Sequence, residues 1–305
     1  ISNYIINGVS NKKNETSISI NDLLSVDIKD SNIDIKGRST EINLNELIAL
    51  VKSLDSNNSS NSSSYNVSAS LLDSKINLND KRQILSDKID LQYYNSETTA
   101  QLLHKNGEAG FKYKDKKFHI YGSNFGDTFM QNLFSVSKFD GGSLDFSVEG
   151  KIDRFSGVAF IKNTTIREFR LLNNVLAFVN TIPSLVTFSL PSYNTKGLET
   201  KNAYMVFNYK DEVYNITDLS LESDELDILG QGDVSIAKNS IDMRLNLRTD
   251  LGSAASQIPI VGHIIFGKDN ISTSLKIDGK LDDPNIESMI AKEIMVAPLN
   301  TIKRT

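Results

Sequence analysis

The sequence predicts a mainly β protein, a long twisted antiparallel meander with a few short apolar helices. Three observations lead to this prediction. Apolar and polar residues alternate along many short segments, which is the period of a strand with one apolar face. Turn-forming residues separate these segments at a spacing of roughly 8–15 residues. No regular succession of strands and long helices, as in parallel α/β sheets, is visible.

The clearest strands lie in the last third of the chain. In residues 226–236 most even positions are apolar or Gly, and in residues 241–247 the odd positions are apolar. The turn-like residues 238–240 join these segments into a hairpin, and residues 271–281 repeat the pattern. Shorter alternating segments occur at Ile18/Ile20, Val26/Ile28, Ile33/Ile35, Val67/Ala69/Leu71, Ile76/Leu78, Ile89/Leu91 and Leu144/Phe146/Val148.

Four segments follow the helical period instead. Residues 44–54 begin at a capping box formed by Asn43 and Glu46, and residues 129–134 are opened by Asp127. Residues 171–182 are unusually apolar and end at Pro183, and a weaker pattern covers residues 287–296. The apolar helix has about 12 residues, too few to span a bilayer.

We expect four stretches along the chain. Residues 1–55 form N-terminal strands and a short helix that continue the sheet, residues 56–64 a flexible Ser/Asn loop, residues 65–140 a β-meander and residues 141–305 a C-terminal region. The loop is too polar to bury surface. Because the sequence begins at Ile1 and shows neither a signal-peptide pattern nor an apolar run of about 18 residues, we interpret it as part of a longer protein whose anchor lies elsewhere.

Composition argues against several functions. The net charge is -5 with both signs interspersed, so nucleic acid is not an expected partner. The chain has no Cys, which excludes thiol nucleophiles and thiolate metal sites. Its three histidines, His104, His119 and His263, lack metal-ligand spacing.

No catalytic motif is visible either. No Gly-x-Ser-x-Gly pentapeptide occurs, and the Asp282-Asp283-Pro284 cluster is typical of a solvated turn. Residues 230–232, Gly-Gln-Gly, lack the third Gly and the helix of a phosphate loop, and they favour close backbone approach or a bulge in a strand. We therefore predict no enzyme activity, no metal and no cofactor.

One-sided apolar strands can serve two purposes. They can pack as a β-sandwich core, or they can leave an open face that holds lipid chains. Burial of each CH₂ is worth about 0.8 kcal/mol, so a two-chain phospholipid is disfavoured in water by roughly 20 kcal/mol. An apolar groove removes that barrier without a catalytic residue. Alternation alone leaves both interpretations open.

An ordered series of motifs distinguishes the C-terminal half. The series begins with residues 142–150 and the apolar helix at 171–182, and it continues with Leu229-Gly230-Gln231-Gly232. It closes with 258-IPIVG-262, 265-IFG-267 and 277-IDGKLDDP-284, which form its most specific part. This order resembles the C-terminal region of AsmA-like proteins, the YhdP and TamB superfamily of bacterial bridge-like lipid transfer proteins. The tail from Val296 to Thr305 is similar to the Campylobacterota branch.

The resemblance implies a fold, a place and a function. The fold is a long twisted antiparallel meander curled into an open groove, a β-taco. The place is the periplasm, with a tether to the inner membrane through a segment outside this chain. The function is membrane-associated transport of phospholipid between the inner and outer membranes, as part of outer-membrane biogenesis, with phospholipids and the two membranes as partners.

Alternation and the resemblance together give candidate residues. The candidates for the lipid groove are Ala203, Met205, Phe207, Leu226, Ile228, Val234, Ile236, Ile241, Met243, Leu245, Leu247, Leu275 and Ile277. The candidates for the groove end or a membrane interface are Leu172, Val175, Leu176, Val179, Ile182, Ile260, Ile264 and Phe266. The competing hypothesis is a structural or assembly protein of the envelope that has the same fold, a core filled by its own side chains and no lipid cargo.

Overall fold

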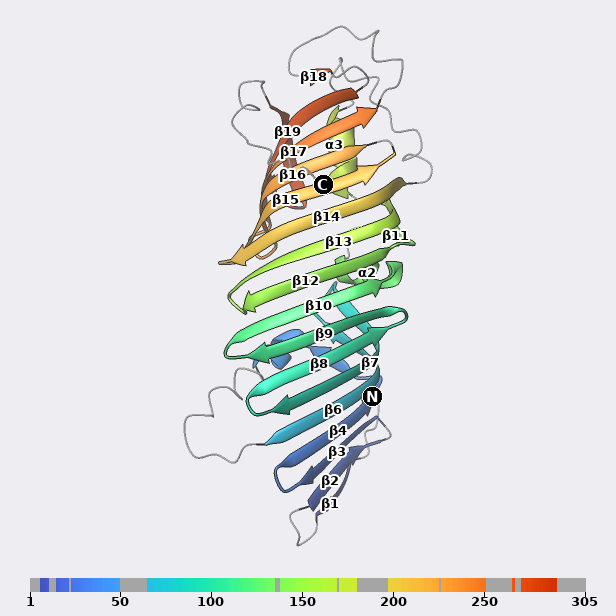
Figure 1. Cartoon of the computed structure of the whole chain (residues 1–305), viewed down its shortest axis with the longest axis vertical. Helices are drawn as coiled ribbons and strands as arrows, with labels where there is room; N and C mark the ends of the chain where they lie inside the picture. The colour runs from blue at the N-terminus through green and yellow to red at the C-terminus, as the bar shows by residue number, and fades with distance from the viewer. Residues whose placement is uncertain are drawn as a thin grey trace, which may run out of the picture. The chain divides into compact units, whose positions relative to one another are not determined.

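The computed structural model describes residues 6–10, 15–21, 23–49, 65–134, 138–168, 170–179, 197–224, 226–250, 265–266 and 270–289. These residues are mainly β, as the sequence predicts (Figure 1). The chain divides into two compact units, unit 1 with residues 1–155 and unit 2 with residues 156–305.

Unit 1 is a ladder of neighbouring strands. Its strands are β1 (Ile6–Ser10), β2 (Glu15–Ile20), β3 (Leu24–Lys29), β4 (Asn32–Arg38), β5 (Glu41–Asn43), β6 (Asn66–Asn77), β7 (Gln83–Tyr94), β8 (Glu97–His104), β9 (Gly107–Lys114), β10 (Lys117–Phe125), β11 (Lys138–Asp140) and β12 (Ser143–Lys151). The antiparallel pairs are β1–β2, β2–β3, β3–β4, β6–β7, β7–β8, β8–β9, β9–β10 and β10–β12. Among the pairings described, β1 pairs with β2 alone, so this ladder is open.

Tight turns connect these strands. At 95–96 between β7 and β8, and at 115–116 between β9 and β10, both turn residues have positive φ. Two consecutive residues in that region make the two-residue hairpin turn whose twist matches that of the strands. The predicted meander is therefore confirmed over β6–β10.

One part of unit 1 departs from the predicted antiparallel pattern. Strands β4 and β5 both pair with β6 in parallel, with Ile35 opposite Ala69 and Ile42 opposite Ile76. Parallel neighbours need a long crossover connection rather than a hairpin. The chain between β5 and β6 is long enough for one, and it includes a helix at 44–49. The rest of the predicted helix and the predicted loop at 56–64 lie outside the described residues.

Unit 2 is fully antiparallel where its pairing is described. Its elements are β13 (Arg154–Arg167), which begins at the unit boundary, α3 (Arg170–Val179), β14 (Leu198–Lys210), β15 (Val213–Ser223), β16 (Asp227–Ser235), β17 (Ser240–Asp250), β18 (Ile265–Phe266), β19 (Asn270–Lys280) and β20 (Asp283–Ser288). The described pairs are β14–β15, β15–β16, β16–β17, β17–β19, β18–β19 and β19–β20. The predicted hairpin of β16 and β17 is confirmed, with Asp227 opposite Arg248 and Ser235 opposite Ser240.

The helix predicted at 287–296 is wrong at its start. Glu287 and Ser288 belong to β20, where they lie opposite Lys276 and Leu275 of β19. The neighbouring strand β19 offers hydrogen bonds to the backbone N–H and C=O groups of this segment. Its weak helical period therefore does not determine its structure. Residues 290–296 lie outside the described part of the chain.

The glycines of β16 confirm the predicted close approach. Gly232 has a φ of +146°, and a Cβ there would meet the backbone of Asp242 and lie 2.6 Å from Cα of Met243. At Gly230 a Cβ would lie 2.6 Å from Cδ2 of Leu245. Because Gly230 and Gly232 have no side chain, β17 and Leu245 can pack closely against β16.

Candidate functional site

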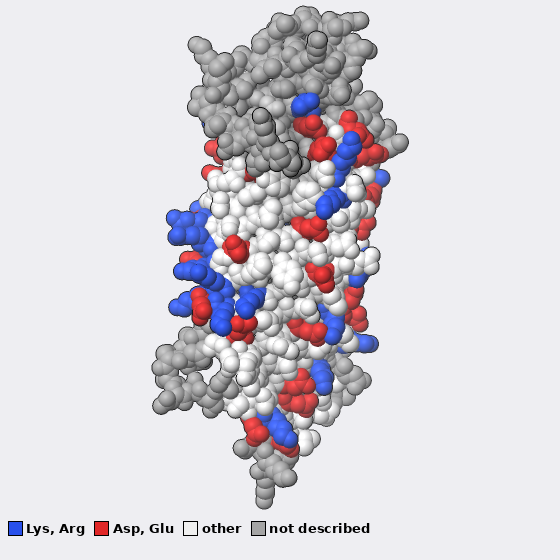
Figure 2. All heavy atoms as spheres, in the orientation of Figure 1, with Lys and Arg blue, Asp and Glu red and all other residues white. Residues whose placement is uncertain are grey.

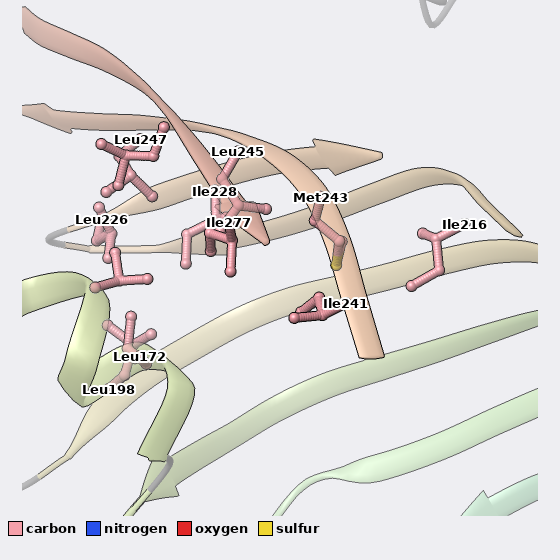
Figure 3. Close-up of a cluster of buried hydrophobic side chains, with 12 residues drawn as sticks. Leu172, Leu198, Ile216, Leu226, Ile228, Ile241, Met243, Leu245, Leu247 and Ile277 are labelled. Atoms are coloured by element: carbon pink, nitrogen blue, oxygen red, sulfur yellow. The ribbon is translucent and has the colours of Figure 1, made fainter. Parts of the chain in front are cut away.

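Most of the groove candidates that the sequence indicates lie in one apolar cluster of unit 2. Its buried members are Leu172, Val175, Leu198, Ile216, Leu226, Ile228, Ile241, Met243, Leu245, Leu247, Leu275 and Ile277. Met205, Phe207 and Val234 are partly buried against it. Figure 3 shows the buried members converging from neighbouring strands and from α3. We call this set the unit 2 cluster.

Strand register explains why these residues meet. Met243 lies opposite both Gly232 and Ile277, and Leu245 lies opposite both Gly230 and Leu275. Residues opposite each other in a sheet point to the same face, so alternation within each strand becomes rows of apolar side chains across strands. The opposite face carries Asp242 and Arg244, which are exposed.

Two bulges keep β14 and β15 in this arrangement. The pairing skips Lys201 in β14 and Thr217 in β15. An extra residue reverses which side chains face the core. Leu198 therefore points inward before the first bulge, and Met205 and Phe207 after it.

Helix α3 covers part of the cluster. Leu172 and Val175 are only 3% and 1% exposed, and Phe178 packs at the edge. These three positions lie on one side of a helix, at spacings of three residues. The apolar face of this part of unit 2 is thus occupied by side chains of the chain itself.

The remaining candidates are placed differently. Ala203 is half-buried opposite Leu221, and Ile236 is 45% exposed in the turn after β16. The structure does not describe the side chains of Leu176, Val179 or Phe266. The other three lie outside the described residues and are Ile182, Ile260 and Ile264.

Unit 1 carries a second apolar face, which the candidate residues did not include. Its central row, in cross-strand register from β2 to β12, is Ile18, Val26, Ile35, Ala69, Leu91, Ala100, Phe111, Ile120 and Val148. A parallel row contains Ile20, Leu24, Leu71, Ile89, Leu102 and Ala109. We call these rows the apolar face of unit 1.

This face differs from the unit 2 cluster in exposure. Every residue of the central row is half-buried except Ile18, which is 37% exposed. Half-buried aliphatic and aromatic side chains in contiguous rows are typical of a binding surface rather than of a packed core. The signal was present in the sequence, since the alternation at Ile33/Ile35, Val67/Ala69/Leu71 and Ile89/Leu91 marks the same strands.

Helix α2 (Asp127–Phe134) closes one end of several of these strands. Phe129 and Met130 are buried, and the ring of Phe129 stacks on Phe125 with centroids 3.9 Å apart. Gln83 of β7 donates a hydrogen bond to Asn132 of the helix at 3.1 Å. This small aromatic core holds α2 on the sheet.

His104 lies beneath α2 and is 7% exposed. Its ring lies 6.0 Å from that of Phe129, and its Nδ1 is 3.5 Å from a carboxylate oxygen of Asp87, which is long for a hydrogen bond. Neither ring nitrogen has a hydrogen-bond partner among the described residues. His119 instead contacts the hydroxyl of Ser147 at 3.2 Å on an exposed face, and His263 lies outside the described residues. Across the described ranges, no group of three or more His, Asp or Glu side chains is arranged to hold a metal ion.

Asp127 anchors the start of α2. Hydrogen bonds from the backbone amides of Gly141 and Thr128 to its carboxylate lower the pKa of Asp127. An acidic residue in a first helical turn also interacts favourably with the helix dipole. The carboxylate therefore ties the helix to the chain segment that leads into β12.

We expect Asp127→Asn to reduce the free energy of unfolding by about 1 kcal/mol at pH 7, because Asp127 is only half-buried and solvent screens the charge interactions that the substitution removes. The folded-state pKa is lowered, so this stabilisation is fully present above the unfolded pKa of about 3.9 and is lost as pH falls through the folded value. Urea denaturation of both proteins between pH 7 and 3 measures it. The two stabilities should converge at the acidic end, and a constant difference would contradict the assignment.

A family model described as YhdP protein matches residues 7–286, which include the apolar rows of both units. No curated protein sequence matches the chain. None of the helices in the described ranges has the length and apolarity needed to cross a bilayer.

Proposed function

This chain belongs to the YhdP family, and on that premise we propose that it carries phospholipid between the inner and outer membranes with the acyl chains held on its apolar sheet faces. The family is one of AsmA-like lipid transport. We place the chain in the periplasm, with the tether to the inner membrane supplied by a segment outside residues 1–305. Lipid enters as cargo, and the proposal gives the protein no enzymatic role.

The observation that carries the proposal is the half-exposed apolar face of unit 1. Its central row crosses from β2 to β12 without a charged side chain. Neighbouring strands are about 4.8 Å apart, and one acyl chain fills about half of a 30 Å hydrocarbon layer, so a chain lying along the row would span roughly three strands. The row is therefore long enough to hold an acyl chain in several successive positions.

A continuous apolar row also favours movement. Each CH₂ that leaves an apolar contact for water costs about 0.8 kcal/mol, whereas a shift along a uniform row exchanges one apolar contact for another. Lipid could thus pass along the face without catalytic groups. The polar and charged residues of the opposite face, such as the Lys88–Asp90 ion pair at 2.7 Å, remain in water.

The unit 2 cluster supports a second candidate function. Its residues are buried against one another and α3, as expected of an envelope structural or assembly protein whose β core is filled by its own side chains. We propose that the candidates in this cluster line the same kind of apolar face and that α3 occupies part of it. The two functions then differ in whether unit 1 holds lipid.

Native mass spectrometry and thin-layer lipid analysis of the chain, expressed in a bacterial envelope and purified in its folded form, test the proposal. We expect phospholipid to co-purify with the protein. A folded protein that carries no lipid, and that binds none when phospholipid is supplied, would instead support the structural or assembly function.

A further inference from the structure

The polar face of unit 1, on the other side of the sheet from its apolar face, contains a cavity. This cavity has a volume of about 330 Å³ and is lined by residues of four neighbouring strands, β3, β4, β6 and β7. The parallel pair β4–β6 lies at its centre, with β3 on one side and β7 on the other. Its volume is in the range of small-molecule sites in proteins. We call this cavity the polar cleft.

Strand register places two rows of polar side chains in the cleft. The first row runs from Asp27 through Asp34 and Ser68 to Gln92, and the second from Lys29 through Asn32 and Asn66 to Tyr94. Successive residues of a strand point to opposite faces, so the apolar rows lie on the other side of the same strands. A ligand in the polar cleft would therefore leave the apolar face of unit 1 free.

Side-chain length explains the shape of the cleft. In the two rows, the central strands β4 and β6 carry only Asn, Asp and Ser, and these short side chains form a floor. Longer side chains stand on either side of this floor, Lys29 on β3 and Gln92 and Tyr94 on β7. A flat ligand can thus lie on the floor and contact the wall that β7 forms.

Hydrogen bonds fix the floor and leave capacity for a ligand. Nδ2 of Asn66 donates to Oδ1 of Asn32 at 3.0 Å, and the hydroxyl of Ser68 donates to Oδ1 of Asp34 at 2.8 Å. The bond from Ser68 lowers the pKa of Asp34, so this carboxylate is ionised at neutral pH and acts as an acceptor. An amide has two N–H donors and a carbonyl oxygen, so each Asn keeps groups that its one bond does not use.

The wall on β7 carries two polar groups that no neighbour engages. Neither the amide of Gln92 nor the hydroxyl of Tyr94 forms a hydrogen bond with another residue in the described ranges. Tyr94 is also 60% exposed. A tyrosine ring presents an apolar face together with a polar tip. This wall can therefore stack on an apolar surface and form hydrogen bonds beside it.

The charges around the cleft favour an uncharged ligand. Lys29 forms an ion pair with Glu15 at 2.8 Å, and Lys36 lies 3.3 Å from a carboxylate oxygen of Asp34. In the lower part of Figure 2, where Figure 1 draws β3 to β7, red and blue side chains stand next to one another. No field of one sign covers these strands on the side in view, so nothing there selects a highly charged molecule.

A sugar ring has the features that such a site would recognise. It is uncharged, its hydroxyl groups both donate and accept hydrogen bonds, and the C–H groups on one side of the ring form an apolar face. We propose that the polar cleft binds a sugar ring of a glycan, with Tyr94 stacked on the apolar face of the ring and with Gln92 and Asp34 hydrogen-bonded to its hydroxyl groups. This site is separate from the lipid surface proposed above.

A saturation-transfer NMR titration of the full chain with cellotetraose and with N-acetylchitotetraose tests the inference. We expect at least one of them to bind, with the strongest transfer to the C–H groups on one face of a sugar ring. Tyr94→Ala should weaken binding roughly tenfold, whereas Tyr94→Phe, which keeps the ring, should bind within about twofold of the unaltered protein. Gln92→Ala, which removes one hydrogen-bonding group, should weaken binding roughly threefold.

The matched control is Tyr121→Ala. Tyr121 is 50% exposed on the same polar face, but it lies in β10 and does not line the cleft. This variant should bind sugar like the unaltered protein. Failure of the unaltered protein to bind either sugar, unchanged affinity in Tyr94→Ala, or an equal loss in Tyr121→Ala would overturn the inference. Binding of a fluorescent phospholipid should be the same in all these proteins, so the proposed function stands or falls separately.

Two further measurements distinguish a sugar from other ligands. A soluble peptide of Gly and Ser offers hydrogen-bonding groups without an apolar ring face, and equally tight binding of this peptide would make the cleft a peptide site and the inference wrong. Added salt should leave the affinity for sugar unchanged, because salt screens charges and the sugars carry none. Loss of binding in salt would show that the cleft recognises charge and would equally overturn the inference.

Discussion

Ala100→Asp is expected to abolish acyl-chain binding by the apolar face of unit 1 while leaving the fold nearly unchanged. Ala100 is half-buried at the centre of this face, between Leu91 and Phe111. In the empty protein a carboxylate there stays hydrated, so we expect a loss of about 1 kcal/mol or less in the free energy of unfolding. Once an acyl chain covers it, the charge must lose its water without a partner, which costs several kcal/mol. Binding of a fluorescent phospholipid should weaken at least a hundredfold.

The neighbouring substitution Thr99→Asp is the matched control. Thr99 lies in the same strand as Ala100 and is also half-buried, but its side chain points to the opposite face. Its cross-strand neighbours are Gln92 and Lys112. It should bind lipid like the unaltered protein. If both variants bind equally well, acyl chains do not lie on this face. If both fail to bind while remaining folded, the effect of Ala100→Asp is not specific to the face.

Sequence alternation predicted the faces of the strands well because it is a local property. Each strand of the β16–β17 hairpin has a period of two, so the inward positions of Ile241, Met243 and Leu245 follow from the sequence. Their gathering into a single cluster follows from register, which the predicted turn at 238–240 fixes. The family resemblance, drawn from the C-terminal motifs, is confirmed by the match over residues 7–286.

Whether a face is covered could not be predicted in the same way. The apolar patterns of Leu245 and of Leu91 are alike in sequence, yet one is buried and the other half-exposed. The difference depends on which elements dock on each face, among them α3 on the unit 2 cluster. Docking of a helix far along the chain is a long-range event with no periodic signature. The groove candidates lie in unit 2 because the family resemblance rests on C-terminal motifs, so the half-buried apolar face of unit 1 is not among them.

The parallel pairing of β4 with β6 escaped prediction for a related reason. A hairpin is recognisable from a turn between two strands, whereas a crossover leaves no short signal. The bulges at Lys201 and Thr217 are similar, because one extra residue shifts the face of a strand without altering its composition. In this chain the local residue pattern determines where the strands lie, and the connections between strands determine which strands pair.

Leu245→Asp tests the unit 2 cluster and should have the largest effect on stability. Leu245 is 7% exposed, opposite both Gly230 and Leu275. Truncation of a buried leucine alone costs about 2–5 kcal/mol, and an unpaired buried carboxylate adds to that. We expect the free energy of unfolding to fall by more than about 4 kcal/mol, measured by urea denaturation followed by circular dichroism. Any loss of lipid binding in this variant would therefore report on folding rather than on contact with lipid.

The matched control for Leu245→Asp is Arg244→Asp. Arg244 is the preceding residue of the strand, lies on the exposed face and is opposite Lys276. It introduces the same carboxylate into the same strand beside a cation, so it should change stability by less than about 1 kcal/mol. If Leu245→Asp were equally well tolerated, the side chain would have to be hydrated in the native protein. The unit 2 cluster would then be an open face like that of unit 1, and its residues would be accessible to acyl chains. A large difference between the two variants instead shows that the unit 2 cluster is a packed core, which leaves the apolar face of unit 1 as the proposed surface for lipid.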